Sequence, residues 1–489
     1  MPHPIISNSN SRTFIPWIAA LILLSSLASC TSIDKEEPSG SEESTAWKMA
    51  DEIRAAVKAP EFPDRVFDVT DLGAAADGSR DDLPAFKTAI SDCHEAGGGV
   101  VLVPAGEYFL AGPIHLKSNV NLHLEEGALV KFSTEPTDYL PVVFTRWEGA
   151  ELMNFSPLIY AFEQENIAVT GKGVLDGQAA QENWWKWKKQ QNFPVAHPDG
   201  GMTTSRSLLI EWNRSEVPVA ERVFGDGHHL RPNFIQPYRC KNVWIEGVTF
   251  KNSPMWIMHP VLCENVLIEG VSVVSHGPNS DGCDPESCRD VVIRDCYFDT
   301  GDDCIALKSG RNQDGRRIAA PIERVVVENC TMKDGHGGVV IGSEVSGGAR
   351  YIFGENCEMD SPNLDRAIRV KTNRSRGGTI EHLYFRNIEV GEVKEAVVKV
   401  NMQYTLDDSI SIFYPTVGHI SVENVNSTSS KYGVMLVGYD KEHQIADVNV
   451  SNCRFAGVRE GNLIEFVSDI HFEHLYINGE LVVSPDSED

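Results

Sequence analysis

The chain has 489 residues, of which 42% are hydrophobic, so it is long enough to bury a large core. Its formal net charge of −27 at pH 7 makes it a poor binder of nucleic acid, because nucleic acid is itself anionic. Any acidic polymer is repelled at long range for the same reason, so an acidic substrate requires a local basic patch.

An apolar run near the N-terminus, FIPWIAALILLSSLASC (14–30), has the length of a signal peptide and ends in small residues. It is too short and too early for a membrane-spanning helix. Its last four residues, Leu27 to Cys30, resemble a bacterial lipobox, in which cleavage precedes a cysteine that then carries lipid. We therefore predict a lipoprotein-type signal peptide over residues 1–30, with Cys30 as the lipidation site and an ordinary secretory signal as the alternative.

Residues 31–62 combine an acidic tether with a short helix. The tether, TSIDKEEPSGSEES, is polar and poor in apolar residues, a composition typical of flexible chain. The following TAWKMADEIRAAVKAP places four apolar side chains on one helical face. These are Trp47, Ala50, Ile53 and Val57.

The remaining residues, 63–489, are predicted to form one domain. A capping helix is expected in DDLPAFKTAISDCHEAGGG (81–99), where an aspartate and an early proline begin the helix and three glycines end it. Residues 136–240 break the strand pattern that follows and contain the run ENWWKWKK, so we predict a long insertion on the cleft side. Its tryptophans have two possible roles, packing or stacking on sugar rings.

A strand of alternating apolar residues, followed by Asn, Gly or Asp, recurs through the second half of the chain. Four of the eight copies are NVWIEGVTF (242), NVLIEGVSV (265), DVVIRDCYF (290) and RVVVENCTM (324), and the others start at 351, 382, 419 and 447. The starts are 23 to 37 residues apart, a spacing typical of solenoids. One coil cannot bury its apolar face alone, so this pattern predicts an all-β fold, a parallel β-helix of stacked coils.

Two columns of equivalent positions support this stacking. Cys296, Cys330, Cys357 and Cys453 occupy the place where other copies carry valine or isoleucine. A cysteine that exchanges with valine is most simply a small buried hydrophobe, so we expect mostly free thiols and no metal site. Five asparagines share another column, and stacked asparagines can hydrogen-bond along the axis. These are Asn329, Asn356, Asn387, Asn424 and Asn452.

Four loops after these repeats superimpose without gaps: SDGCDPES, GDDCIALKSG, GHGGVVIGSE and LDRAIRVKTN. The superposition places Asp281, Asp302, His336 and Asp365 in one column, with roughly 4.8 Å between coils. In the last loop, period two directs Arg369 and Lys371 outward. Asp281, Asp302 and His336, with Asp303 beside them and the two cations, predict an external strip of three carboxylates, one imidazole and two cations.

Such a strip has a limited chemistry. Carboxyl groups that lie close together repel each other when ionised, so their pKa values differ and one group stays protonated while others ionise. Glycoside hydrolysis uses such groups, a proton donor for the leaving oxygen and a base for water. A single aspartate is most simply a solvated turn residue, whereas four motifs in register favour an active site.

The motifs NSDG (279–282), GDD (301–303), GHG (335–337) and RVK (369–371), in this order, resemble the four signatures of glycoside hydrolase family 28, the polygalacturonases. FDVTDLGAAADGSRDD (67–82) is similar to the start of pectin-degrading β-helices. The resemblance implies a right-handed parallel β-helix and inverting hydrolysis of α-1,4-galacturonosidic bonds in pectin, without a cofactor.

The resemblance also implies the role of each site residue. Asp302 is expected to be the general acid, Asp281 and Asp303 to hold and activate water, and His336 to tune the acid. Three further residues are expected to bind the galacturonate: Arg369, Lys371 and, one coil on, Tyr404.

Three alternatives remain open. A rhamnogalacturonan hydrolase of the same family shares the fold, a pectate lyase cuts by elimination with calcium, and a non-catalytic β-helix binds carbohydrate without cutting it. The insertion favours exo action, because a wall at one end of the cleft admits only a chain terminus. The lipobox predicts an outer-membrane lipoprotein that faces the periplasm or the cell surface and touches the membrane only through its lipid.

Overall fold

The computed structural model describes residues 39–406 and 408–485. The chain divides into two compact units, Met1–Glu43 and Ser44–Asp489. Helix α1 (Ser39–Ala56) begins in the first unit, and all later elements belong to the second. The predicted signal peptide with Cys30, and residues 31–38 of the tether, lie outside the described residues. Within the described ranges, no helix has both the length and the apolarity needed to cross a membrane.

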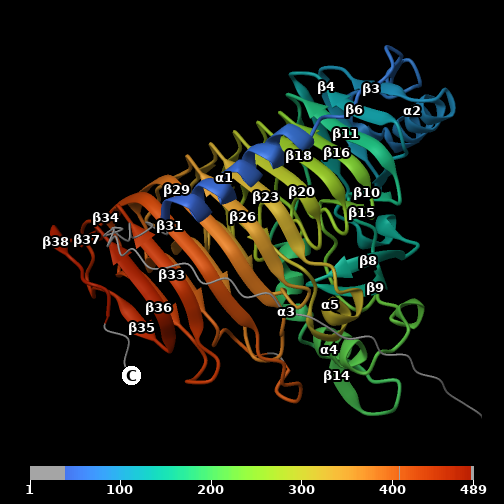
Figure 1. The fold of residues 1–489 in the computed structure, drawn as a ribbon. Coiled ribbons are helices and arrows are strands. Elements are labelled where there is room, and N and C mark those ends of the chain that lie inside the picture. The colour runs from blue at the N-terminus through green and yellow to red at the C-terminus, as the bar shows by residue number, and fades with distance from the viewer. Residues whose placement is uncertain (1–38, 407, 486–489) are drawn as a thin grey trace, which may run out of the picture. The chain divides into compact units, whose positions relative to one another are not determined.

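Stacked parallel strands form the body of the second unit, a right-handed parallel β-helix (Figure 1). The eight predicted repeats form consecutive rungs of one sheet: β16 (Lys241–Glu246), β18 (Glu264–Glu269), β20 (Arg289–Arg294), β23 (Ile322–Glu328), β26 (Ala349–Glu355), β29 (Thr379–Glu392), β31 (Thr416–Ser429) and β33 (Ile445–Ser451). A ninth rung that the repeat pattern did not include, β36 (Val467–Glu473), pairs with β33. Equivalent apolar residues lie opposite one another, as Ile245, Ile268 and Ile293 do. The predicted solenoid is therefore confirmed.

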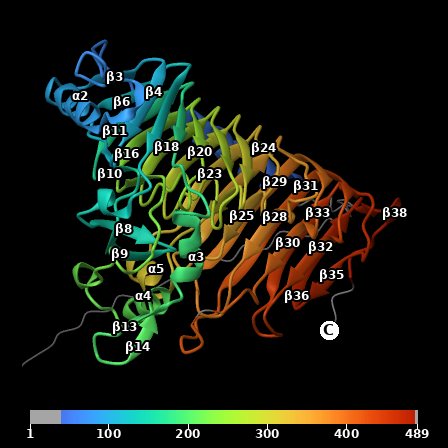
Figure 2. The ribbon, with the colours of Figure 1, turned by 180° about the vertical axis from the view of Figure 1, so that it is seen from behind.

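A second parallel sheet carries the loops with the candidate site (Figure 2). Its strands are β22 (Ile305–Leu307), β25 (Val339–Gly342), β28 (Arg366–Lys371), β30 (Ala396–Asn401), β32 (Tyr432–Val437) and β35 (Leu463–Glu465). Ile305, Val339 and Ile368 lie opposite one another and point into the core. Because side chains alternate along a strand, the residues between them point outward.

The core contains the cysteines where the repeat predicts them. All ten cysteines between Cys93 and Cys453 are buried and carry free thiols, which confirms their interpretation as small apolar residues. In the asparagine column, Asn424 donates to Asn387 at 2.9 Å. All five asparagines of this column have φ between +52° and +57°, a conformation that asparagine adopts more readily than most residues. The turn geometry thus explains the column more fully than the hydrogen bond does.

Two helices cover the solenoid in different ways. The predicted face of α1, from Trp47 to Val57, is buried against outward-pointing residues of four rungs: Leu267, Val292, Val326 and Phe353. Helix α1 therefore lies along the sheet rather than over its end (Figure 1). Helix α2 (Leu83–Glu95) packs on β3 (Gly99–Val103) near the N-terminal coils and buries Phe86, Ile90 and Cys93, as predicted.

The prediction of one continuous insertion over 136–240 is wrong. Within it, β11 (Glu165–Gly171) pairs with β6 (Val120–Leu124) and β16, and β10 (Ile159–Phe162) pairs with β15 (Ile235–Tyr238). The coil forms because these short strands bury the same alternating apolar positions as other rungs. Two insertions remain: the hairpin of β8 (Val143–Trp147) and β9 (Ala150–Asn154), and residues 177–234 with α3 (Trp187–Gln190) and α4 (Ser205–Arg214).

Candidate active site

A cavity of about 930 Å³ lies where the turns before β22, β25 and β28 meet both insertions. Nine lysines and arginines line it, with six aspartates and glutamates. The cations are Lys188, Arg206, Arg214, Lys308, Arg311, Arg366, Arg369, Lys371 and Arg376. A chain of net charge −27 thus provides the local basic patch that an acidic ligand requires.

The gapless superposition of the loops is wrong for the first pair. Cys283 lies opposite Ile305, which places Asp281 opposite Asp303 rather than opposite Asp302. The reason is that the two turns differ in length. Residues 276–282 connect the paired positions Ser275 and Cys283 in one coil, whereas only residues 301–304 connect the equivalent Thr300 and Ile305 in the next coil. In the following coils, Asp302, His336 and Asp365 do align as predicted.

The three catalytic candidates do come together, but not on an external strip. One carboxylate oxygen from each of Asp281, Asp302 and Asp303 lies within 4.8 Å of those of the other two. The side chain of Asp303 is fully buried, whereas that of Asp302 is 17% exposed. The predicted strip is therefore the floor of a cavity, because the insertions and the neighbouring turns rise around it.

Both predicted substrate-binding cations contact Asp303 in this structure. Arg369 donates to Oδ1 of Asp303 at 3.2 Å, and Lys371 donates to Oδ2 at 2.5 Å. The ring of Tyr404 lies 5.5 Å from the Arg369 guanidinium and 5.6 Å from the Lys371 ammonium. All three side chains line the cavity, where a ligand carboxylate would compete with Asp303 for the two cations.

His336 and Asp302 form an ion pair at the edge of the cavity. Nδ1 of His336 lies 2.9 Å from Oδ1 of Asp302. The hydrogen bond and the charge of Asp302 raise the pKa of His336, although burial opposes this. Burial favours the neutral form of Asp302, but His336 and the nearby lysines outweigh it and lower the pKa of this carboxyl.

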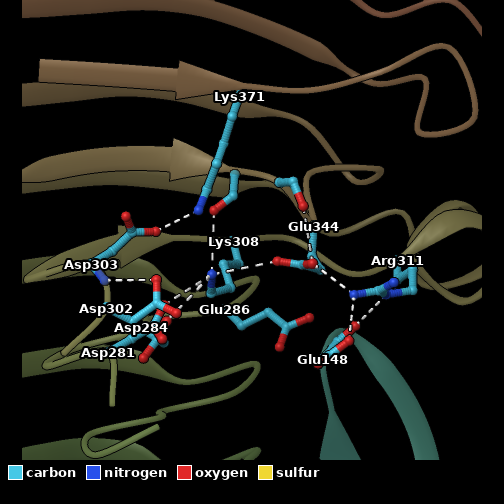
Figure 3. Close-up of polar contacts among 12 residues, drawn as sticks. Glu148, Asp281, Asp284, Glu286, Asp302, Asp303, Lys308, Arg311, Glu344 and Lys371 are labelled. Carbon is cyan, nitrogen blue, oxygen red and sulfur yellow. Dashed lines mark hydrogen bonds and ion pairs between the residues drawn. The ribbon is translucent and has the colours of Figure 1, made fainter. Parts of the chain in front are cut away.

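At the bottom of the cavity lies a cluster of largely buried charges that the sequence interpretation missed (Figure 3). Nζ of Lys308 lies 3.8 Å from Asp281, 3.4 Å from Asp284 and 3.4 Å from Glu344. Burial strongly raises the pKa of Asp281, and the charges of Asp302 and Asp284 add to this. The sequence contained a signal for Lys308. In IALK (305–308), side chains alternate along the strand, so Ile305 and Leu307 point inward and Ala306 and Lys308 point outward.

Three more residues of the site had no signal in the repeats. Trp256 is buried against the cavity, and its ring centre lies 4.4 Å from the Lys308 ammonium. Arg231 donates to the carbonyl oxygen of Pro278 and to the side chain of Asn279, which fixes the NSDG turn. Glu148, at the tip of the β8–β9 hairpin, accepts from Arg311 at 3.0 Å.

The tryptophans of the second insertion pack rather than line the cavity. Trp184 and Trp187 are buried with their ring centres 4.9 Å apart, and Trp185 donates to the carbonyl oxygen of Ser253. They anchor α3, which presents Lys188 to the cavity. The packing role is therefore the one that the structure supports.

Among the described residues, two acidic groups have spacings that could hold a metal ion: Asp281, Asp302 and Asp303, and separately His276, Asp299 and Asp334. Within the first group, Asp303 already carries the two cationic partners described above. We assign no metal ligands to either group, because acidic groups of this spacing are common without a metal.

The chain was compared with families of known proteins. Residues 221–471 match the family described as glycosyl hydrolases family 28, and residues 66–123 match the one described as rhamnogalacturonase A/epimerase, pectate lyase-like. An exo-poly-alpha-D-galacturonosidase of Dickeya chrysanthemi is 25% identical over 84% of this chain and 70% of its own length. A probable polygalacturonase of Vitis vinifera is 29% identical over 67% of this chain, which spans 61% of that relative.

Solved structures give a closer match. The exopolygalacturonase of Thermotoga maritima is 42% identical, with a TM-score of 0.83, over 89% of this chain and 97% of that chain. The family 28 exopolygalacturonase of Yersinia enterocolitica, at 22% identity and a TM-score of 0.67, shares the fold over 86% of this chain and 80% of its own.

The ion pair predicts how His336 titrates. In the wild type, NMR of the imidazole should give a pKa above the ordinary value of about 6.5, because Asp302 favours the charged ring. Asp302→Asn should lower this pKa, since the amide keeps the shape but not the charge. The exposed Asp295→Asn serves as the control. A His336 titration that is the same in all three proteins would contradict the pairing.

Proposed function

Because the chain belongs to glycosyl hydrolases family 28, we propose that it hydrolyses α-1,4-galacturonosidic bonds of pectin, attacking polygalacturonate or its oligomers from a chain end. One observation carries this proposal: the carboxylates of Asp281, Asp302 and Asp303 gather at a cavity that Asp281 and Asp302 line, and in this cavity cations outnumber anions. The carboxylates supply acid and base, and the cations compensate the charge of a uronic acid.

Asp302 is placed to protonate the leaving oxygen, because it lines the cavity and is the most exposed of the three carboxylates. Without substrate, the charges of His336 and the nearby lysines lower the pKa of Asp302, which favours the ionised carboxylate over the protonated acid. The Asp302–His336 pair nevertheless holds one proton across a 2.9 Å contact. That proton must reside on Asp302 when the glycosidic C–O bond breaks, and His336 then becomes neutral.

Asp281 and Asp303, which lie opposite each other, are placed to hold the attacking water. One of the two carboxylates takes a proton from the water molecule as the water oxygen bonds to the anomeric carbon. At the same time the bond from that carbon to the leaving oxygen breaks, and Asp302 gives its proton to the leaving oxygen. The carboxylate oxygens lie within 4.8 Å, closer than the roughly 6.5–9.5 Å usual for inverting enzymes. Carboxylate spacing therefore does not by itself predict inversion, which we infer from the family motifs.

Exo action is supported by the insertions. Glu148 from the hairpin and six residues of 177–234 line the same cavity as the catalytic candidates. Both insertions leave the solenoid before the Asp281 coil, whereas Arg369, Lys371 and Tyr404 follow it. We infer that the insertions form a wall of the cavity, so that only a chain terminus of a galacturonan enters it.

We also infer export and lipid anchoring from residues 1–30, with the protein facing the periplasm or the cell surface. The lipobox-like LASC supports this assignment. Cys30→Ser should abolish lipid attachment, so that the protein leaves the membrane fraction or stays unprocessed, whereas Cys93→Ser should not change its fractionation. Unchanged membrane association of Cys30→Ser would contradict the anchor.

The acid role predicts the effect of Asp302→Asn. Turnover on polygalacturonate should fall by about 10²–10⁴-fold, because an amide cannot deliver the proton. The exposed Asp295→Asn is the matched control and should retain activity. Reducing-end assays give turnover, and circular dichroism checks folding. Near wild-type turnover in Asp302→Asn would exclude this residue as the acid.

The wall predicts the products. Polygalacturonate should release one small product, a galacturonate monomer or dimer, from the first minutes, with little loss of viscosity. Rapid viscosity loss with mixed oligomers would mean an open cleft. An unsaturated, ultraviolet-absorbing product would indicate a lyase, action on rhamnogalacturonan alone would indicate the other hydrolase, and binding without new reducing ends would indicate a non-catalytic protein.

A matched pair of variants tests the wall directly. Lys188 lines the cavity, whereas the adjacent Lys189 is exposed and does not. Lys188→Gln should raise KM for short galacturonate oligomers several-fold, because it removes a cation from the blind end, and Lys189→Gln should leave KM unchanged. Equal effects of the two substitutions would argue that α3 does not border the bound substrate.

A further inference from the structure

Lys308 lies beside the catalytic carboxylates at the bottom of the cavity, directly after β22. Its side chain is only 2% exposed, and its strand register places it in one column with Gly342 and Lys371. Its Nζ lies 3.8 Å from Oδ2 of Asp281 and 3.4 Å from Oδ1 of Asp284 (Figure 3). Throughout residues 39–406 and 408–485, no other lysine or arginine nitrogen lies within 4.0 Å of these two carboxylates.

These two carboxylates have few other partners. In the described part of the chain, Oδ1 of Asp281 and both side-chain oxygens of Asp284 accept no hydrogen bond, and all three atoms are buried. An ionised carboxyl group without a partner is very unfavourable in such a place. Asp281 also faces the charges of Asp302 and Asp303, so the ammonium of Lys308 is the group on which its ionisation depends.

The Lys308 ammonium also contacts groups other than Asp281 and Asp284. It donates to the carbonyl oxygen of Gly342 at 3.2 Å and to Glu344 at 3.4 Å, and it lies over the ring of Trp256. Glu344 accepts from Arg311 at 2.8 Å, and Arg311 donates to Glu148 at 3.0 Å. Alternating charges therefore fix the ammonium between the hairpin insertion and Asp281.

We propose that Lys308 is a positioning residue that holds the carboxylate of Asp281 as an anion opposite Asp303, where it can take the proton of the attacking water. Lys308 itself does not contact the reacting atoms, because Asp281 lies between. The proposal rests on the hydrolytic function inferred above. The charged groups that face Asp281 are Asp284, Asp302, Asp303 and Lys308, with Arg231 of the second insertion farther away.

The test is the pH profile of Lys308→Met, which keeps the length of the side chain and removes its charge. A base must be ionised to act, so activity falls as the pH drops below its pKa. Removing the ammonium raises that pKa, and the acidic limb of kcat should move up by roughly 1–3 pH units. KM should stay within about twofold, because the Lys308 side chain borders the cavity but is only 2% exposed.

Two further variants make the outcome decisive. Lys431→Met removes a lysine whose side chain is 42% exposed and pairs with Glu460, far along the chain from the site, and it should leave the profile unchanged. Glu344→Gln removes an anion that competes for Lys308, so its acidic limb should move down, opposite to that of Lys308→Met. This variant decides the question if Lys308→Met does not fold. An unmoved limb with uniformly lower kcat, or a raised KM alone, would overturn the proposal.

Titration without substrate separates this proposal from the proposed function. In protein labelled with ¹³C at the aspartate carboxyls, the Asp281 signal, assigned by Asp281→Asn, should titrate at higher pH in Lys308→Met than in the wild type. If the wild type does not hydrolyse polygalacturonate but this shift occurs, the function is wrong and the electrostatic role stands. If hydrolysis occurs without the shift, the role of Lys308 is wrong.

Discussion

Parallel stacking is the constraint on which the whole site depends. Neighbouring coils lie roughly 4.8 Å apart, so acidic positions in consecutive coils become neighbours even though their charges repel. Asp281 and Asp303 face each other for this reason. The same stacking supplies the remedy, because outward positions two coils further on carry Arg369 and Lys371, which both reach Asp303. The fold thus gathers aspartates in neighbouring coils and compensates their negative charge with cations from coils nearer the C-terminal end.

Much of this arrangement can be derived from periodicity alone. Period two fixed the inward positions of Ile368 and Val370 and hence the outward positions of Arg369 and Lys371, and both pairs lie as expected. Exchange of cysteine with valine predicted buried free thiols, since both side chains fill the same small volume. The buried face of α1 was visible in its helical spacing. These features depend on local geometry that the chain repeats, so one sequence is enough to find them.

Features that depend on unequal turns or on single residues were not accessible in this way. The turn before Cys283 is three residues longer than its counterpart before Ile305, and a gapless superposition therefore assigned Asp281 the wrong partner. Burial of the predicted strip also escaped prediction, because the covering elements come from insertions with no repeat. Trp256 and Arg231 belong to no recurring pattern, and only the three-dimensional arrangement brings them to the site.

The hairpin insertion links the wall of the cavity to the charged residues around Lys308. Glu148 at its tip holds Arg311, Arg311 holds Glu344, and Glu344 is one of the anions around Lys308. The proposed wall of the cavity and the proposed positioning of the base therefore share one network of charged contacts, so a substitution in the hairpin tip tests both proposals.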